Sequence, residues 1–256
     1  MRTHIIAELA SNHGGDLALA CDLISAAADA GADWVKVQAY RPECLRLGDP
    51  QRDWLTQSAL TPNGLEQLKA HADSRGVKFL ASVFDRHSAW HVRSLGCSAV
   101  KLGSGEVGRS MLWQDLEVFG FSTVFYGCGL SSEWRFPWPG AVITQACVPM
   151  YGVSQYPTPE LRASTVLKRM VMRGPLPWGW SDHCYTLKTC QEAMEFGATY
   201  VERHIAFPDR GRCQDWDSHP TAFKTLRRYA EACAWEGTEA HSSARSQFVG
   251  RWKEEA

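Results

Sequence analysis

Trp178-Gly-Trp-Ser-Asp-His183 and Tyr200-Val-Glu-Arg-His204 are the two segments that decide the fold of this chain. Both have the length of a buried strand, and neither shows the 3.6-residue apolar period of a helix. The run between them, Leu187–Phe196, is compatible with a crossover helix and is followed by a Gly-Ala pair. If the segments are adjacent parallel strands, His183 and His204 emerge side by side, about 5 Å apart, at one edge. Two imidazoles with acidic neighbours can hold a divalent cation there.

Apolar strand-like runs alternate with amphipathic helical runs along the rest of the chain. Eight runs are predicted as strands, most of them apolar on both faces as a parallel sheet requires: His4–Glu8, Trp34–Gln38, Lys78–Phe84, Ala99–Gly103, Thr123–Tyr126, Val148–Val153, Trp178–Ser181 and Tyr200–Ile205. The predicted helices are Asp16–Ala30, Leu65–Ser74, Arg86–Ser94, Ser110–Phe119, Glu160–Met172, Leu187–Phe196 and Ala222–Trp235. This order predicts a single-domain α/β fold, a (β/α)8 TIM barrel. An open doubly wound sheet is the alternative, but no Gly-x-Gly-x-x-Gly follows the first strand.

The fifth βα unit and the end of the chain depart from this pattern. Ser131–Gln145 contains Trp134, Pro137 and Pro139, and the prolines disfavour a regular helix, so we expect an irregular fifth unit. Residues 237–256 are polar and aperiodic. We therefore predict a barrel domain over residues 1–236 and a polar tail over 237–256.

The composition limits the functional classes. A chain of 256 residues that is 45% hydrophobic can bury one large core, and its net charge of −1 indicates neither a nucleic-acid partner nor a membrane partner. Without a long apolar run or a leader-like start, the predicted location is the cytoplasm. The nine cysteines include no Cys-x-x-Cys pair and are predicted to be reduced thiols. The eleven tryptophans are explained either by core packing or by an aromatic wall that faces a substrate.

Chemistry-bearing residues gather where the predicted strands end, which is the functional rim of a TIM barrel. The fourth strand runs into Lys101-Leu-Gly-Ser104-Gly-Glu106, and burying a lysine there is costly without an anionic ligand. Together with Lys36 on the second strand, Lys101 and Ser104 would suit a phosphate group. Glu8 and Glu106 would then handle protons or bind hydroxyl groups.

Each of these residues also has a structural explanation. A lysine or glutamate at a strand end can belong to a structural ion pair, and Ser104 and Ser181 can satisfy loop amides. The convergence of lysines, hydroxyls, carboxylates and two histidines on one rim favours a functional site. A metal held by His183 and His204 could act as a Lewis acid on a carbonyl oxygen.

Six motifs, in order along residues 4–235, resemble the sialic acid synthase (N-acetylneuraminate synthase) family. They are Ala7-Glu8-Leu-Ala-Ser-Asn12-His13-Gly-Gly15, Gly31-Ala-Asp-Trp-Val-Lys36-Val-Gln38, Lys101-Leu-Gly-Ser104-Gly-Glu106, Tyr156-Pro-Thr-Pro159, Gly179-Trp-Ser-Asp-His183 and Glu202-Arg-His204. In addition, Asp215 stands where the family has the aspartate of its GPD stretch.

The resemblance implies a barrel enzyme that condenses phosphoenolpyruvate with an aldehyde sugar. The acceptor would be N-acetylmannosamine-like or another aldose, and the products a 2-keto-3-deoxy sugar acid and phosphate. It also implies a homodimer, and a Mn²⁺ or Mg²⁺ ion bound by His183 and His204. Glu8, Lys101 and Glu106 are implied as catalytic groups together with those histidines. The residues implied to bind substrate are Lys36, Gln38, Ser104, Ser154, Tyr156, Ser181, Asp182 and Asp215.

Three departures from the family pattern bear on this expectation. The family's STGM phosphate turn reads Gly127-Cys128-Gly129-Leu130, so a hydroxyl is missing. Met150-Tyr-Gly-Val-Ser-Gln-Tyr156 lacks the family's His-Cys pair. The antifreeze-like domain that lends an arginine to the partner subunit is expected to be absent, which favours a different acceptor aldehyde. The alternatives are a related barrel aldolase or lyase on another phosphorylated substrate, and a non-catalytic ligand-binding barrel.

Overall fold

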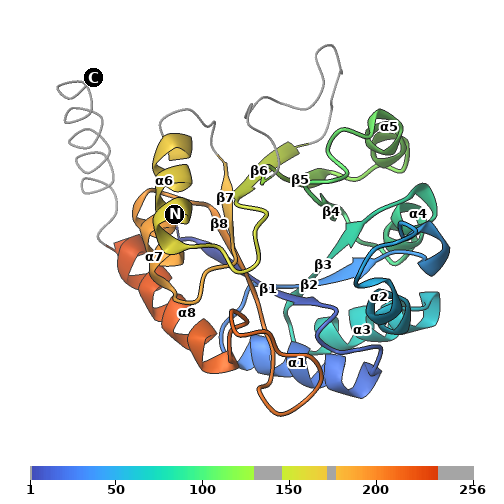
Figure 1. Ribbon diagram of the computed structural model, residues 1–256, viewed down its shortest axis with the longest axis horizontal. Helices are drawn as coiled ribbons and strands as arrows, with labels where there is room; N and C mark the ends of the chain where they lie inside the picture. Colours follow the sequence, from blue (N-terminus) through green and yellow to red (C-terminus); the bar gives the residue numbers. More distant parts are fainter. Residues whose placement is uncertain (1, 130–145, 172–176, 236–256) are drawn as a thin grey trace.

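Eight parallel strands form a closed barrel, as the sequence predicts, and the helices form a ring outside it (Figure 1). The computed structural model describes residues 2–129, 146–171 and 177–235. The strands are β1 (His4–Ala10), β2 (Trp34–Ala39), β3 (Lys78–Val83), β4 (Ala99–Leu102), β5 (Thr123–Gly127), β6 (Ala146–Gly152), β7 (Gly179–Asp182) and β8 (Tyr200–His204). β1 pairs with β8 in parallel, with Glu8 opposite His204, and this pairing closes the sheet.

The helices begin and end largely where local signals place them. They are α1 (Leu17–Asp29), α2 (Arg52–Ser58), α3 (Pro62–Ser74), α4 (Arg86–Ser94), α5 (Ser110–Val118), α6 (Glu160–Val171), α7 (Lys188–Glu195) and α8 (Pro220–Trp235), with a 3₁₀ turn, η1 (Pro42–Cys44). The Asp16 carboxylate accepts hydrogen bonds from two first-turn amides of α1, and Gly31 follows that helix with a φ of +84°. The sequence analysis missed η1 and α2. α2 buries only Ser58, so no apolar stripe marks it as a helix.

The barrel interior is layered because successive side chains point to opposite faces of each strand. An apolar layer fills the end of the barrel near the strand N-termini and consists of Ile6, Leu80, Ala99, Phe125, Val148 and Met150. Two residues after Ile6 comes Glu8, and two residues after Ala99 comes Lys101; both line the cavity described below. The charged groups therefore lie inside the barrel, toward the C-terminal ends of the strands.

Two sequence predictions lie outside the described residues. They are the irregular fifth βα unit, Ser131–Gln145, and the polar tail, 237–256. All nine cysteines are free thiols, as predicted. Among the described helices, none is both long enough and apolar enough to cross a membrane.

Candidate active site

A cavity of about 320 Å³ opens at the C-terminal ends of the strands. It brings together most of the residues that the sequence singled out: Glu8, Lys36, Gln38, Lys101, Ser104, Glu106, Ser154, Tyr156, Ser181, His183 and His204. The predicted rim is therefore one continuous site in space. Its volume falls within the range of small-molecule sites, about 300–1,000 Å³.

Buried charges form the floor of this cavity around Glu202. The Lys101 ammonium donates to Glu202 Oε1 at 2.6 Å and to Ser181 Oγ at 3.1 Å. Lys36 Nζ lies 3.5 Å from the same Glu202 oxygen and also forms an ion pair with Glu8. All four charged side chains are almost completely buried. Two ammonium and two carboxylate groups thus share one water-poor volume.

The network sets the protonation of its members. Burial by itself would raise the pKa of Glu202, but the nearby charges of Lys101 and Lys36 hold that pKa well below its usual range. Burial lowers the pKa of Lys36 to about 7, against the opposing charge of Glu202. Glu202 stands at the end of a predicted strand but was assigned no catalytic or binding role from the sequence, although it precedes His204 by two residues and so faces the same side of β8. That alternation was the signal that could have identified it.

Two glycines make room for two serine hydroxyls beside the lysines. A Cβ atom on Gly127 would lie 2.6 Å from Ser104 Oγ, and a Cβ atom on Gly129 would collide with Ser154 Oγ. The Gly129 amide donates to Ser104 Oγ at 3.0 Å. The hydroxyl that the family's phosphate turn would carry at position 127 has no space here, because Ser104 already occupies it. The result is a cradle of hydroxyl groups that can surround a phosphate or carboxylate.

His183 and His204 face each other on the opposite wall, with ring centroids 5.6 Å apart. His183 Nδ1 lies 3.1 Å from the Val153 carbonyl, which directs Nε2 away from that backbone. Tyr156 packs on His183 at 4.1 Å, and Trp216 packs edge-on to His204 at 4.7 Å between centroids. Burial lowers the pKa of His183 to about 4 and that of His204 well below its ordinary value. Both rings are therefore neutral near pH 7, the state in which imidazole binds metals.

The donor set around this pair fits a divalent cation with open coordination positions. His204 Nδ1 and Asp217 Oδ1 are both buried, lie 4.0 Å apart and have no hydrogen-bond partner among the described residues. Asn12 donates to the other Asp217 oxygen at 3.2 Å, and burial raises the pKa of that carboxyl to about 6. In the described part of the chain, no three His, Cys, Asp or Glu side chains converge into a closed metal site. A cation on the two histidines would thus keep positions for substrate or water.

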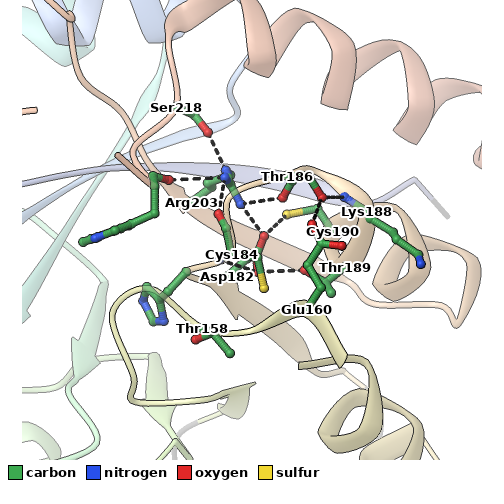
Figure 2. Close-up of polar contacts among 12 residues, drawn as sticks. Thr158, Glu160, Asp182, Cys184, Thr186, Lys188, Thr189, Cys190, Arg203 and Ser218 are labelled. Atoms are coloured by element: carbon green, nitrogen blue, oxygen red, sulfur yellow. Dashed lines mark hydrogen bonds and ion pairs between the residues drawn. The ribbon is translucent and has the colours of Figure 1, made fainter. Parts of the chain in front are cut away.

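Asp182 does not face substrate, contrary to the sequence prediction. Because Ser181 and His183 point into the barrel, the strand alternation turns Asp182 outward. There it forms a buried ion pair with Arg203 and accepts hydrogen bonds from Thr189 (2.8 Å) and Cys190 (3.0 Å), as Figure 2 shows. Its role is to connect β7, β8 and α7 behind the site.

Asp215 is the second residue that was predicted to bind substrate but does not line the cavity. Its side chain is exposed and lines neither cavity, and the acidic residue beside His204 is Asp217, two positions later. Both lie in the segment between β8 and α8, where no regular period indicates which side chain turns inward. Trp216, between them, does face the histidines, whereas Trp178 and Trp180 are buried in the core.

A second cavity of about 390 Å³ adjoins the first and shares Gln38, Tyr156 and His204 with it. Its other walls come from the end of β1 and the two residues after it, from α2 with the preceding Gln51, and from the segment after β8. It was not predicted, because most of its residues lie in irregular segments or in α2, where no regular period indicates which side chains turn inward.

Together these features define an α/β barrel with an anion cradle and a neutral histidine pair in one pocket. The chain belongs to the NeuB family, whose model matches residues 23–232. The resemblance drawn from the motifs is thereby confirmed.

Curated and solved relatives agree with this assignment. N,N'-diacetyllegionaminic acid synthase of Legionella pneumophila is 26% identical over 228 residues, which cover 80% of this chain and 64% of that protein. Pseudaminic acid synthase of Campylobacter jejuni is 32% identical over 234 residues, covering 80% and 65%. N-acetylneuraminic acid (sialic acid) synthetase from Leptospira borgpetersenii, crystallised with citrate, matches with a TM-score of 0.83 at 26% identity, covering 93% of this chain and 86% of that one. The chain spans just under two thirds of the length of the two curated relatives.

Proposed function

We propose that this chain condenses phosphoenolpyruvate with an aldehyde sugar to give a 2-keto-3-deoxy sugar acid and phosphate. The observation that carries the proposal is one cavity that holds the buried Lys101 ammonium and the serine cradle opposite the paired imidazoles of His183 and His204. An anionic donor and a carbonyl acceptor can therefore be held in contact, which removes much of the entropic cost of a two-substrate reaction.

The anionic donor would occupy the side of the cavity with the lysines. Lys101 and the hydroxyls of Ser104, Ser154 and Ser181 are charged or polar donors suited to phosphate and carboxylate oxygens. Lys36 lies next to them and is restrained by its ion pair with Glu8. Phosphoenolpyruvate would offset part of the cost of burying two ammonium groups.

The reaction balances without a redox partner. The methylene carbon of phosphoenolpyruvate forms a bond to the aldehyde carbon, and the aldehyde oxygen takes up a proton to become a hydroxyl. The oxygen of a water molecule adds to the carbon bearing the phosphate, and the bond between that carbon and the bridging phosphate oxygen breaks to release phosphate. The water oxygen loses its protons and becomes the keto oxygen of the product. His183 and His204 would hold a Mn²⁺ or Mg²⁺ ion, which supplies positive charge where negative charge develops on the aldehyde oxygen.

Two carboxyl groups are placed to move protons. Glu8 Oε1 accepts a hydrogen bond from the Ala10 amide at 2.6 Å, and its other oxygen pairs with Lys36, so the carboxylate is fixed in place. Burial raises the pKa of Glu106, which lies at the opposite rim of the cavity beside Gly103. A raised pKa favours the protonated form of a carboxyl group, which is the form that delivers a proton. We assign proton delivery to Glu106 and the orientation of the attacking water to Glu8.

The test is phosphate release from phosphoenolpyruvate in the presence of Mn²⁺ and a panel of aldoses. We expect release by the wild type and its loss in His204→Ala. His87→Ala, which changes an exposed histidine on α4, serves as the matched control and should release phosphate like the wild type. If folded wild-type protein releases no phosphate with any aldose of the panel, the proposal is refuted. Calorimetric binding of phosphoenolpyruvate without turnover would instead favour a non-catalytic ligand-binding barrel.

A further inference from the structure

The second cavity differs from the first in its charge. The first contains the carboxylates Glu8, Glu106 and Glu202. The second has no acidic side chain among its lining residues, which are Ala10, Ser11, Asn12, Gln38, Gln51, Trp54, Leu55, Tyr156, His204, Arg212, Gln214 and Trp216. Arg212 is its one permanently charged group within the described part of the chain. A ligand with negative charge is therefore favoured in this compartment.

Arg212 is held in place by neutral groups. Its backbone amide donates to the Asn12 carbonyl at 2.8 Å, which attaches the segment after β8 to the end of β1. Its guanidinium lies over the Trp54 ring, 5.2 Å from the centroid. With the Gln214 amide turned so that its oxygen faces the arginine, that oxygen accepts from Nε at 2.5 Å and from Nη2 at 3.0 Å.

No carboxylate in the described part of the chain lies within ion-pair distance of this guanidinium. Among residues 2–129, 146–171 and 177–235, none forms an ion pair with Arg212, and Asp217, which its charge influences, lies beyond ion-pair distance. Since Nη1 has no protein partner at hydrogen-bond distance in the same residues, the fork of the guanidinium keeps donor capacity for a ligand.

The remaining walls suit a polyhydroxylated molecule. The amides of Gln38, Gln51 and Asn12 offer donors and acceptors, and the rings of Trp54 and Trp216 offer flat apolar faces. The cavity begins at His204 and Tyr156, which it shares with the first cavity. A sugar whose aldehyde lies at the histidine pair would thus extend toward Arg212.

We propose that the second cavity binds the body of the acceptor sugar and that Arg212 selects an acceptor with an anionic group, a phosphate ester or a carboxylate, away from its aldehyde. This proposal rests on the proposed function for the direction of the sugar, but its binding test does not require turnover. Arg212 is the specificity-determining residue, and Trp54 orients its guanidinium.

The test compares mannose, mannose 6-phosphate and mannuronate, three sugars with the same ring stereochemistry, by calorimetric titration of the wild type. We expect at least one of the two anionic sugars to bind about 10- to 100-fold more tightly than mannose. The phosphate and carboxylate arms identify which anion is preferred. Arg212→Gln should remove the preference, and Arg212→Lys should retain part of it because the charge remains without the planar fork.

The matched control is Arg228→Gln, an exposed arginine on α8, which should keep the preference. Thermal unfolding of each variant confirms that it is folded. Equal affinity of the wild type for all three sugars, or a preference that survives in Arg212→Gln, would overturn the proposal. Titration with phosphoenolpyruvate separates the two claims. A wild type that does not bind phosphoenolpyruvate and does not release phosphate contradicts the proposed function. The sugar preference measured in the same protein still reports on Arg212.

Discussion

Asp182 and Arg203 form a buried ion pair on the outer face of the barrel, directly behind the two histidines that face each other inside it. The register of β7 and β8 places these two residues opposite each other. Arg203 also donates to the Cys184 carbonyl at 2.6 Å (Figure 2). It donates to the Trp216 carbonyl at 3.2 Å as well. One guanidinium therefore connects the segment after β7 with the segment after β8, and both segments contribute to the walls of the site.

Arg203→Met is expected to lower the free energy of unfolding by about 3–5 kcal/mol, because it leaves the Asp182 carboxylate buried without its partner. The double variant Asp182→Asn/Arg203→Met should be less destabilised than the single variant, since no unpaired charge remains. Urea unfolding measures both. Arg75→Met, which breaks an exposed ion pair with Asp29, is the control and should cost less than about 1 kcal/mol. Equal effects of Arg203→Met and Arg75→Met would contradict this account of the buried pair.

Gly127→Ser should weaken phosphoenolpyruvate binding although it supplies the hydroxyl found in the family's phosphate turn. Its Cβ atom would displace Ser104 Oγ, which lies 2.6 Å from that position, and Ser104 would lose its contact with the Gly129 amide. We expect the dissociation constant for phosphoenolpyruvate to rise about tenfold or more, measured by calorimetry. Gly108→Ala, where an added Cβ meets nothing within 4 Å, is the control. Tighter binding by Gly127→Ser would show that the cradle is incomplete rather than full.

Acid should destabilise the protein partly through Asp33. Burial by itself would raise the pKa of this carboxyl, but the nearby His4 ring, the hydrogen bonds from the Ile5 amide and the Arg227 guanidinium, and the charge of Arg227 hold it well below its usual range. A lowered folded pKa contributes stability that is present above the unfolded pKa of about 3.9 and is lost as the pH falls through the folded value. The free energy of unfolding of the wild type should therefore fall more than that of Asp33→Asn between about pH 6 and about pH 2. If the free energies of unfolding of the two proteins fall equally with pH, Asp33 does not contribute to the acid sensitivity.

Mn²⁺ binding should depend on the histidine pair. We expect calorimetry to detect the ion in the wild type, with binding lost in His183→Ala and kept in His87→Ala, because the neutral imidazoles of the pair are the proposed ligands and His87 is on the surface. Chelation with EDTA should stop phosphate release, and added Mn²⁺ should restore it. Undiminished release after chelation would argue that the histidines serve another purpose, such as hydrogen bonding to the aldehyde oxygen.

Local sequence was enough to predict the barrel and most of its rim. The carboxyl ends of parallel strands meet at one edge, so a residue that ends a predicted strand is placed without knowledge of the rest of the fold. That is why Lys101, Ser104, His183 and His204, which are distant in sequence, were all predicted to share a site, and why they share one. Consistent use of the strand alternation would also have put Asp182 outside and Glu202 inside.

The positions of the other residues around the site were decided only by the tertiary structure. Asp217 rather than Asp215 approaches His204, and Arg212 faces a cavity whose other wall is α2, a helix with no periodic signal. These residues lie in irregular segments, and their directions follow from contacts between distant parts of the chain, such as the bond from the Arg212 amide to the Asn12 carbonyl. A strand or helix carries its side-chain direction in its own backbone period. A loop acquires its side-chain directions from whatever it packs against. The sequence therefore predicts which chemical groups line the rim at the strand ends, while the tertiary structure determines the compartment beside it.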